Sequence, residues 1–245
     1  MGMIARLLGR KAVPQVELVY KAHRMVFEYN NPTEEIRTAR YGLEKDILFQ
    51  FLDRLRPDDV VLDIGASVGL LAVHSAKIAS KVIAIEPDPE TFSRLQRHVQ
   101  INRLRNVECL PLALADTEGT VTLYSDGASG HAPSLRGEHP HAPKGTVTVR
   151  QTTVDKLFEG PGRPAPTVIK IDIEGAEYLC LKGAARILKG QPKPRLLLIE
   201  VHPTFLPQFG GKAEDVEPIM ADLGYRAVSR TVREEQAHYF FEPVT

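Results

Sequence analysis

The chain has 245 residues, of which 43% are hydrophobic and 25% are charged, the balance of an ordinary globular protein rather than a disordered one. Its 31 Lys and Arg residues equal its 31 Asp and Glu residues, and this neutral total argues against a nucleic-acid substrate. No apolar run reaches membrane-spanning length, and Cys109 and Cys180 offer neither a disulfide framework nor a zinc spacing, so we expect a cytoplasmic protein with reduced thiols.

The first 40 residues have no clear hydrophobic period, apart from strand-like stretches within residues 16–29. We expect them to form an N-terminal extension that packs on a single domain of residues 41–245. Apolar residues at helical spacing predict a helix over residues 41–55, which Pro57 ends.

The next part of the chain alternates between strand-like and helix-like segments. In order, we expect a strand ending near Asp63, a helix over 70–79, a strand over 81–87, a helix over 88–104 and a strand over 107–114. Alternation with a period of two then predicts an antiparallel pair over 120–124 and 146–150. The connection between them, residues 125–145, is long and rich in Gly, Pro, Ser and His, and we expect a lid, a binding loop or a disordered insertion.

The C-terminal part continues the same alternation. We expect strands over 167–173, 195–201, 225–230 and 238–243, a helix that runs through Leu188, and a helix over 213–223. The middle strands are continuously apolar, which indicates a mostly parallel sheet with helices on both faces. The link between the last two strands is too short to hold a crossover helix, so this pair is predicted to be antiparallel.

A strand, a glycine-bearing turn and a helix N-terminus over residues 61–70 form a binding corner for a nucleotide-like ligand. A dinucleotide fingerprint requires glycine where this chain has Ser67, and the charge of Asp63 would oppose a pyrophosphate. S-adenosylmethionine has no phosphate, and Asp63 can bind its ammonium group. Gly65 allows close approach of the ligand, and Glu86 is placed to bind the ribose hydroxyls. The alternative is that Asp63 and Glu86 only cap the turn and the helix that follow them.

Six strings of the chain resemble the FkbM-type S-adenosylmethionine-dependent methyltransferases. They are VLDIGASVGL, IAIEPDPETFSRLQRHVQIN, LALADTEGTVTLY, TTVDKL, VIKIDIEGAEYLCLKGA and LLLIEVH, between about Tyr41 and His202. The resemblance implies an α/β, Rossmann-like class I methyltransferase fold, in which a seven-stranded, mostly parallel sheet has an antiparallel last strand. It also implies transfer of a methyl group from S-adenosylmethionine to a hydroxyl, often on a sugar or a natural-product scaffold, so we expect a small-molecule or glycosidic hydroxyl as the substrate.

Two alternatives stay open, a nicotinamide-dependent oxidoreductase and a cofactor-binding protein without catalysis. The oligomeric state is also open, and a homo-oligomer is one alternative. The cofactor-binding residues that we expect are Asp63, Gly65, Ala66, Ser67, Gly69, Glu86, Pro87, Leu114, Asp116 and Asp172. Of these, Asp116 or the backbone beside it at Leu114 is expected to reach the adenine.

Polar residues at the carboxyl ends of two predicted strands are candidates for the chemistry, because active sites of open α/β sheets lie at that edge. Asp172 is expected to orient or deprotonate the acceptor hydroxyl, and Glu174 and His202 are further catalytic candidates. The alternative is that both acids cap the next helix and that His202 is structural. Lys170 is expected to form a buried ion pair with Asp172 or Glu200.

No metal is predicted, because nothing in the sequence fixes the geometry of a ligand set. The set at the strand ends that carries suitable ligand atoms consists of Asp172, Glu174, Glu200 and His202. Glu44 is expected either to face the cofactor or acceptor or to be an exposed helix residue. Glu177 is expected to be structural. In the long loop, Ser129 and Ser134 are candidates for contacts with the methionine end or the acceptor, whereas His131, His139 and His141 are expected to be solvated.

Overall fold

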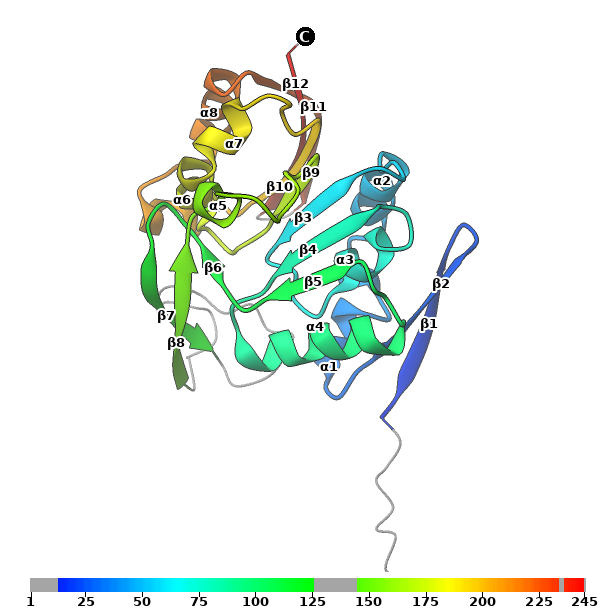
Figure 1. Cartoon of the computed structure of the whole chain (residues 1–245). Coiled ribbons are helices and arrows are strands. Elements are labelled where there is room, and N and C mark those ends of the chain that lie inside the picture. The colour runs from blue at the N-terminus through cyan, green and yellow to red at the C-terminus, as the bar shows by residue number, and fades with distance from the viewer. Residues whose placement is uncertain (1–12, 126–144, 234–235, 245) are drawn as a thin grey trace, which may run out of the picture.

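The computed structural model describes residues 13–125, 145–233 and 236–244 of the chain. Among these residues it shows a twisted seven-stranded sheet between two layers of helices (Figure 1). From one edge to the other the strands are β11 (Tyr225–Arg233), β12 (Gln236–Pro243), β10 (Leu196–Val201), β9 (Val168–Ile171), β3 (Val60–Ile64), β4 (Lys81–Ile85) and β5 (Val107–Leu110). The neighbours from β10 to β5 run parallel, and β12 runs antiparallel to both β10 and β11. The predicted fold class and the antiparallel last strand are confirmed.

The alternation of side chains along the central strands divides the core into two clusters. Leu62 and Ile83 pack on one face of the sheet, against α5 (Val154–Leu157), α6 (Glu177–Gly183), α7 (Ala185–Lys189) and α8 (Val216–Asp222). Val61 and Val82 pack on the other, against α2 (Lys45–Asp53), α3 (Leu70–Ser75) and α4 (Pro89–Ile101). Both faces are therefore buried, as the continuously apolar strands predict, and both thiols are free.

The N-terminal segment contributes a hairpin, β1 (Gln15–Tyr20) and β2 (His23–Glu28), followed by α1 (Pro32–Arg37). Met25 and Phe27 of β2 are fully buried in the second cluster. His98 of α4 joins three parts of the chain, because its Nδ1 donates to the Val68 carbonyl at 2.7 Å and its Nε2 accepts from the Glu28 amide at 3.1 Å. The hairpin thereby holds α4 and the turn after β3 together.

Glu28 attaches the hairpin to α4 through charge, and this predicts a pH dependence of stability. Hydrogen bonds from Arg97 lower the pKa of the nearly buried Glu28 carboxyl to about 2. A carboxyl whose folded pKa is depressed stabilises the fold above its unfolded pKa and loses that contribution as pH falls toward the folded pKa. Because Arg97 is about half exposed, we expect a contribution on the order of 1–2 kcal/mol.

The Glu28→Gln variant should therefore lose less free energy of unfolding than the wild type between pH 5 and pH 3, measured by urea denaturation. Glu17→Gln, which removes an exposed pair with Arg24, is the control and should follow the wild type. Parallel pH profiles for Glu28→Gln and the wild type would contradict this assignment.

A second, smaller sheet lies beside the first, with β6 (Ala113–Leu114), β8 (Gly145–Thr152) and β7 (Gly119–Ser125) in that order. The antiparallel pairing of β7 with β8 is confirmed. The single strand expected over 107–114 is wrong, because Pro111 has no amide hydrogen for the ladder and the chain leaves the main sheet there. Its last part becomes β6, which brings Leu114 to the edge of the site.

Two predicted helices are also interrupted. The helix expected over 41–55 starts as a short 3-10 turn, Tyr41–Leu43, because Gly42 has a φ of +62°. The helix expected to run through Leu188 is divided into α6 and α7 around Gly183, where a side chain would lie 2.0 Å from the Ala115 carbonyl oxygen. No helix in the described ranges combines the length and apolar character needed to cross a bilayer. The predictions for Ser129, His131, Ser134, His139 and His141 lie outside those ranges.

Candidate active site

The turn after β3 requires glycine at two positions. Gly65 has a φ of +77°, and a Cβ there would lie 1.8 Å from the Asp172 carbonyl oxygen. The amides of Gly65 and Ala66 donate to the Ile85 carbonyl at 3.0 and 2.8 Å, so the turn is held against the end of β4. Gly69 has a φ of +90°, and a Cβ there would lie 2.6 Å from Leu95 of α4. Glycine at position 65 thus allows the chain after β9 to lie against the turn, and glycine at position 69 allows α4 to pack against it.

Glu86, at the end of β4, both holds this turn and lines a pocket. Its Oε2 accepts from the Ser67 amide and its Oε1 from the Asp88 amide, each at 2.9 Å. The helix cap is Asp88, which accepts from the Thr91 amide. Burial raises the pKa of Glu86 to about 7, against the effect of these two hydrogen bonds. Glu86 therefore holds the turn and also faces the space beside it. A residue that only capped the next helix would not need to face that space.

That space is the first pocket, which encloses about 680 Å³ with its solvent-open part included, within the usual range of ligand sites. Six of the predicted cofactor-binding residues line it: Gly65, Ser67, Glu86, Pro87, Leu114 and Asp172. Aliphatic side chains supply most of the remaining wall, namely Ile64, Ile85, Leu112, Leu123 and Ile173. Ile64 and Ile85 come from strand ends, and Leu112 and Leu123 from the small sheet and its approach.

The other predicted cofactor residues lie elsewhere. Asp116 is exposed and lines neither this pocket nor the neighbouring one, so Leu114 is the member of that pair at the site. Ala66 lines the neighbouring pocket. Asp63 is fully buried under the turn, and burial raises its pKa. Its contact is Lys170, at 3.5 Å, rather than open space.

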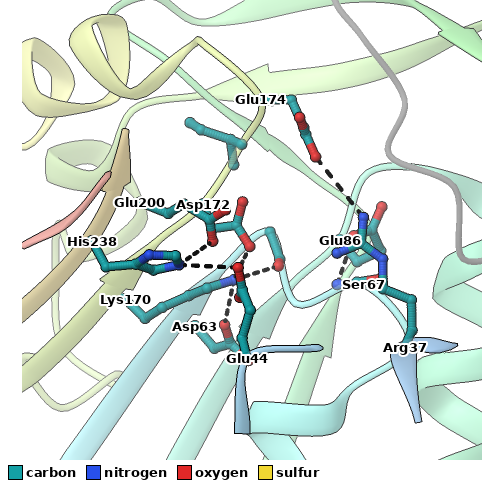
Figure 2. A network of polar contacts seen from close by, with 12 residues as sticks. Arg37, Glu44, Asp63, Ser67, Glu86, Lys170, Asp172, Glu174, Glu200 and His238 are labelled. Atoms are coloured by element: carbon teal, nitrogen blue, oxygen red, sulfur yellow. Dashed lines mark hydrogen bonds and ion pairs between the residues drawn. The ribbon is translucent and has the colours of Figure 1, made fainter. Parts of the chain in front are cut away.

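Lys170 connects the ends of β3 and β9 through its polar contacts, as Figure 2 shows. Its Nζ donates to the Gly65 carbonyl at 2.8 Å and lies 3.1 Å from Asp172 and 3.5 Å from Asp63. Asp63 and Lys170 are register partners on β3 and β9, so the pairing follows from sheet geometry. Burial alone would lower the pKa of Lys170, but Asp172 and Asp63 raise it, and the ammonium stays charged. The predicted ion pair with Asp172 is confirmed, with Asp63 as a second partner.

The DIEGAE segment after β9 is fixed by Glu177. This fully buried carboxylate accepts from the Gly175 amide at 3.0 Å and lies 2.9 Å from Nδ1 of His202. Glu174 has a φ of +54° and Gly175 a φ of +102°, and a Cβ at Gly175 would lie 2.5 Å from Phe205. Glu177 therefore acts as a positioning residue, because it holds both a turn at the site and the nearby imidazole.

His202 has acids on several sides. Its Nε2 lies 3.4 Å from Glu200, 3.5 Å from Glu174 and 3.9 Å from Asp172. Burial alone would lower its pKa, but Glu177 and Glu200 raise the pKa of His202 to about 11. The residue is 2% exposed and lines neither pocket. This position favours a protonated His202 ring that holds the surrounding carboxylates together, rather than the proton-accepting base considered from the sequence.

Glu174 faces the first pocket, where burial raises its pKa to about 7. It lies 3.9 Å from Arg37 of α1 (Figure 2). Arg37 lines both pockets, and the sequence contains no motif that singles it out. Only the folded position of the N-terminal segment identifies this residue as part of the site.

The second pocket adjoins the first, since Arg37, Gly65, Ser67 and Asp172 line both. It encloses about 660 Å³ with its open part included. Its further polar residues are Glu44, Lys170, Glu200 and His238. Glu44 therefore lines this pocket rather than being a fully exposed helix residue. His238 was not predicted; its signal is the register of β10 with β12, which sets it directly opposite Glu200.

Two triads among the described residues have ligand atoms close enough to share a metal ion: Glu44 with Glu200 and His238, and Asp172 with Glu200 and His202. They share Glu200, whose pKa burial alone would raise but which His202 and His238 lower, so this carboxylate is charged. Glu174 belongs to neither triad. One triad therefore keeps three of the four ligands considered from the sequence, and the other joins Glu200 to Glu44 and His238.

Comparisons with known proteins place the chain among methyltransferases. Residues 63–227 match the model of the methyltransferase FkbM domain. The hexuronic acid methyltransferase AglP of Haloferax volcanii is 28% identical over 159 residues, covering 65% of this chain and 62% of that protein. Methyltransferase 1 of Beauveria bassiana is 27% identical over 181 residues, covering 63% of this chain and 70% of that protein. The crystal structure of an FkbM methyltransferase from Methylobacillus flagellatus aligns with a TM-score of 0.52 at 21% identity, over 78% of this chain and 46% of that one.

Proposed function

The chain belongs to the methyltransferase FkbM domain family, and from that premise we propose that it transfers a methyl group from S-adenosylmethionine to a hydroxyl of a sugar or a related scaffold. The observation that carries the proposal is the closure of the glycine turn on Asp172. Gly65 approaches the Asp172 carbonyl where a side chain cannot fit, and Gly65 and Asp172 line both pockets. A cofactor in the first pocket and an acceptor in the second would thus meet at Asp172.

The residues of the first pocket fit S-adenosylmethionine. The aliphatic wall suits an adenosine, and Glu86 offers a carboxylate to the ribose hydroxyls. A cofactor that carries a sulfonium and an ammonium suits a pocket edge where Asp172 and Glu174 lie. The sequence-based expectation that Asp63 binds the ammonium stays a prediction, although its contact in this structure is Lys170.

Bound S-adenosylmethionine would supply an electrophilic methyl group, and the chain's residues would prepare the acceptor. Lys170 holds one Asp172 carboxylate oxygen at 3.1 Å, so the carboxylate has a fixed position at the join of the pockets. From there Asp172 would accept the hydroxyl hydrogen and align the oxygen for an in-line displacement. The aliphatic wall would keep competing water out.

The second pocket supports a polyhydroxylated acceptor. Glu44, Asp172 and Glu200 line it, and carboxylates accept hydrogen bonds from hydroxyl groups. These three carboxylates outnumber the two arginine and lysine side chains of the pocket, Arg37 and Lys170, so the wall disfavours polyanions, in keeping with the neutral composition. That Haloferax volcanii AglP is a hexuronic acid methyltransferase supports a sugar as the acceptor.

Replacing Glu86 with alanine should weaken binding of S-adenosylhomocysteine by about 10- to 100-fold, because the loss of a charged acceptor costs about 1.5–3 kcal/mol. The change removes both the proposed ribose contact and the bonds to the Ser67 and Asp88 amides. Fluorescence competition would measure the dissociation constant. Glu90→Ala, at an exposed position in the first turn of α4, is the matched control and should bind like the wild type. Equal affinities for Glu86→Ala and Glu90→Ala would overturn the assignment of Glu86.

The activity itself is tested by transfer of a labelled methyl group to a panel of free sugars, uronic acids and glycosides. Label in a product that is stable to mild base supports an ether, and hence hydroxyl methylation. Label that mild base releases indicates an ester and would overturn the hydroxyl as acceptor. A chain that binds the cofactor but labels no member of a broad panel would favour binding without catalysis.

A further inference from the structure

Three side chains from distant parts of the sequence converge on the second pocket. Glu44 precedes α2, Glu200 lies near the end of β10 and His238 near the start of β12, and all three line the pocket. Their ligand atoms lie within 4.8 Å of one another. Figure 2 shows Glu44 and Glu200 reaching the His238 ring from different segments. Two of the three ligands therefore come from paired strands of the sheet, and the third comes from the residue just before α2.

The contacts of His238 are not those of an ordinary buried histidine. The side chain is 1% exposed, and its Nε2 lies 3.2 Å from Glu44 Oε1 and 3.2 Å from Glu200 Oε2. Its Nε2 forms ion pairs with both carboxylates, but within the described part of the chain neither ring nitrogen makes a hydrogen bond of acceptable geometry. Buried polar groups are normally hydrogen-bonded, and an ion shared by the imidazole and the two carboxylates would satisfy the ring nitrogen that faces them.

The spacing matches the ligand shell of a divalent ion. Ligand atoms at right angles around a metal, each about 2.1–2.2 Å from it, lie about 3 Å apart. The two distances from His238 Nε2 fall close to that value. Carboxylates suit Mn²⁺ and imidazole suits the later first-row metals, so a site of two carboxylates and one imidazole favours a first-row ion over Ca²⁺ or Mg²⁺, which take oxygen ligands.

The charges at the pocket also favour a cation. Its three carboxylates, Glu44, Asp172 and Glu200, outnumber its arginine and lysine side chains, Arg37 and Lys170, and Lys170 is already shared among Asp172, Asp63 and the Gly65 carbonyl. The other triad is a weaker candidate, because His202 lines neither pocket and its Nδ1 contacts Glu177 at 2.9 Å. Of the two, the triad around His238 is open to an entering ion.

We infer that Glu44, Glu200 and His238 form a binding site for one divalent metal ion of the Mn²⁺ type in the floor of the acceptor pocket. The role of this ion rests on the proposed function: it would hold the acceptor hydroxyl beside Asp172 and make the hydroxyl proton easier to remove. The ion also neutralises the carboxylates that would otherwise face one another there.

Mn²⁺ alone is the probe that tests this site. The purified full chain is treated with chelator and dialysed, and free Mn²⁺ is then measured by electron paramagnetic resonance during titration. We expect one bound Mn²⁺ per wild-type chain, and an affinity lower by at least about tenfold in Glu44→Gln. Asp46→Asn removes an exposed carboxylate two residues away and should leave the affinity almost unchanged.

Two results would overturn the site: Mn²⁺ that stays free in the presence of wild-type protein, or equal affinities for Glu44→Gln and Asp46→Asn. Binding of S-adenosylhomocysteine to the same samples reports that the variants are folded. It also separates the two proposals. A chain that binds S-adenosylhomocysteine and leaves Mn²⁺ free contradicts the metal site alone, and one that binds Mn²⁺ at the triad without S-adenosylhomocysteine contradicts the methyltransferase function alone.

Discussion

Replacing Asp172 with asparagine is expected to lower kcat by about 10²- to 10⁴-fold, the usual contribution of a positioned proton acceptor. Asparagine keeps the size of the side chain but loses the charge that pairs with Lys170 at 3.1 Å and the capacity to take a proton. Because Asp172 lies where the two pockets meet, the loss should fall mainly on the transfer step. Single-turnover rates of labelled methyl transfer, at saturating acceptor, measure it.

The control for Asp172→Asn is Asp116→Asn, which removes an exposed carboxylate that lines neither pocket. We expect this variant to keep the wild-type kcat. The affinity for S-adenosylhomocysteine distinguishes the two roles considered for Asp172, because a variant that binds normally but transfers slowly has lost acceptor chemistry. An unchanged single-turnover rate in Asp172→Asn would remove Asp172 from the mechanism.

The second large effect is expected at Gly65. In Gly65→Ala the new Cβ would lie 1.8 Å from the Asp172 carbonyl oxygen, which belongs to the backbone and cannot move aside as a flexible side chain can. The positive φ adds strain. Together these should lower the free energy of unfolding by about 2–5 kcal/mol and abolish cofactor binding at accessible concentrations. Urea denaturation and a binding titration measure the two effects.

Gly160→Ala separates the clash from the strain. Gly160 also has a positive φ, +91°, but nothing lies within 4 Å of the position that a Cβ would take. We expect this variant to lose only about 1–2 kcal/mol and to bind the cofactor normally. Equal losses in the two alanine variants would show that backbone strain, rather than the approach of Asp172, makes glycine necessary at position 65.

Much of the fold could be predicted from the sequence because its signals are local. Continuous apolar runs identified the buried parallel strands, and a short polar link identified the antiparallel pair at the end. The errors occur where one residue changes a local geometry. Pro111 ends β5 and sends Leu114 to a second sheet, and Gly42 delays the start of α2.

The candidate site was predictable where its residues lie at strand ends and only in part elsewhere. Asp172 and Glu86 follow strands, so their place at one edge of the sheet follows from the alternation of strands and helices. His238 becomes part of the site through its register with Glu200, and Arg37 through the path of the N-terminal segment. Both depend on long-range pairing, which no local pattern encodes. Asp63, in contrast, belongs to a clear local motif, but its contact with Lys170 follows from the register of β3 with β9, which that motif does not encode.

The central claim is that the corner formed by Gly65, Ser67 and Glu86 binds S-adenosylmethionine rather than a nicotinamide dinucleotide. Isothermal titration calorimetry of the purified wild-type chain with S-adenosylhomocysteine, and separately with NADH, tests it most directly. We expect one S-adenosylhomocysteine bound per chain and no heat of binding for NADH. Binding of NADH in the absence of any response to S-adenosylhomocysteine would contradict the assignment of this pocket.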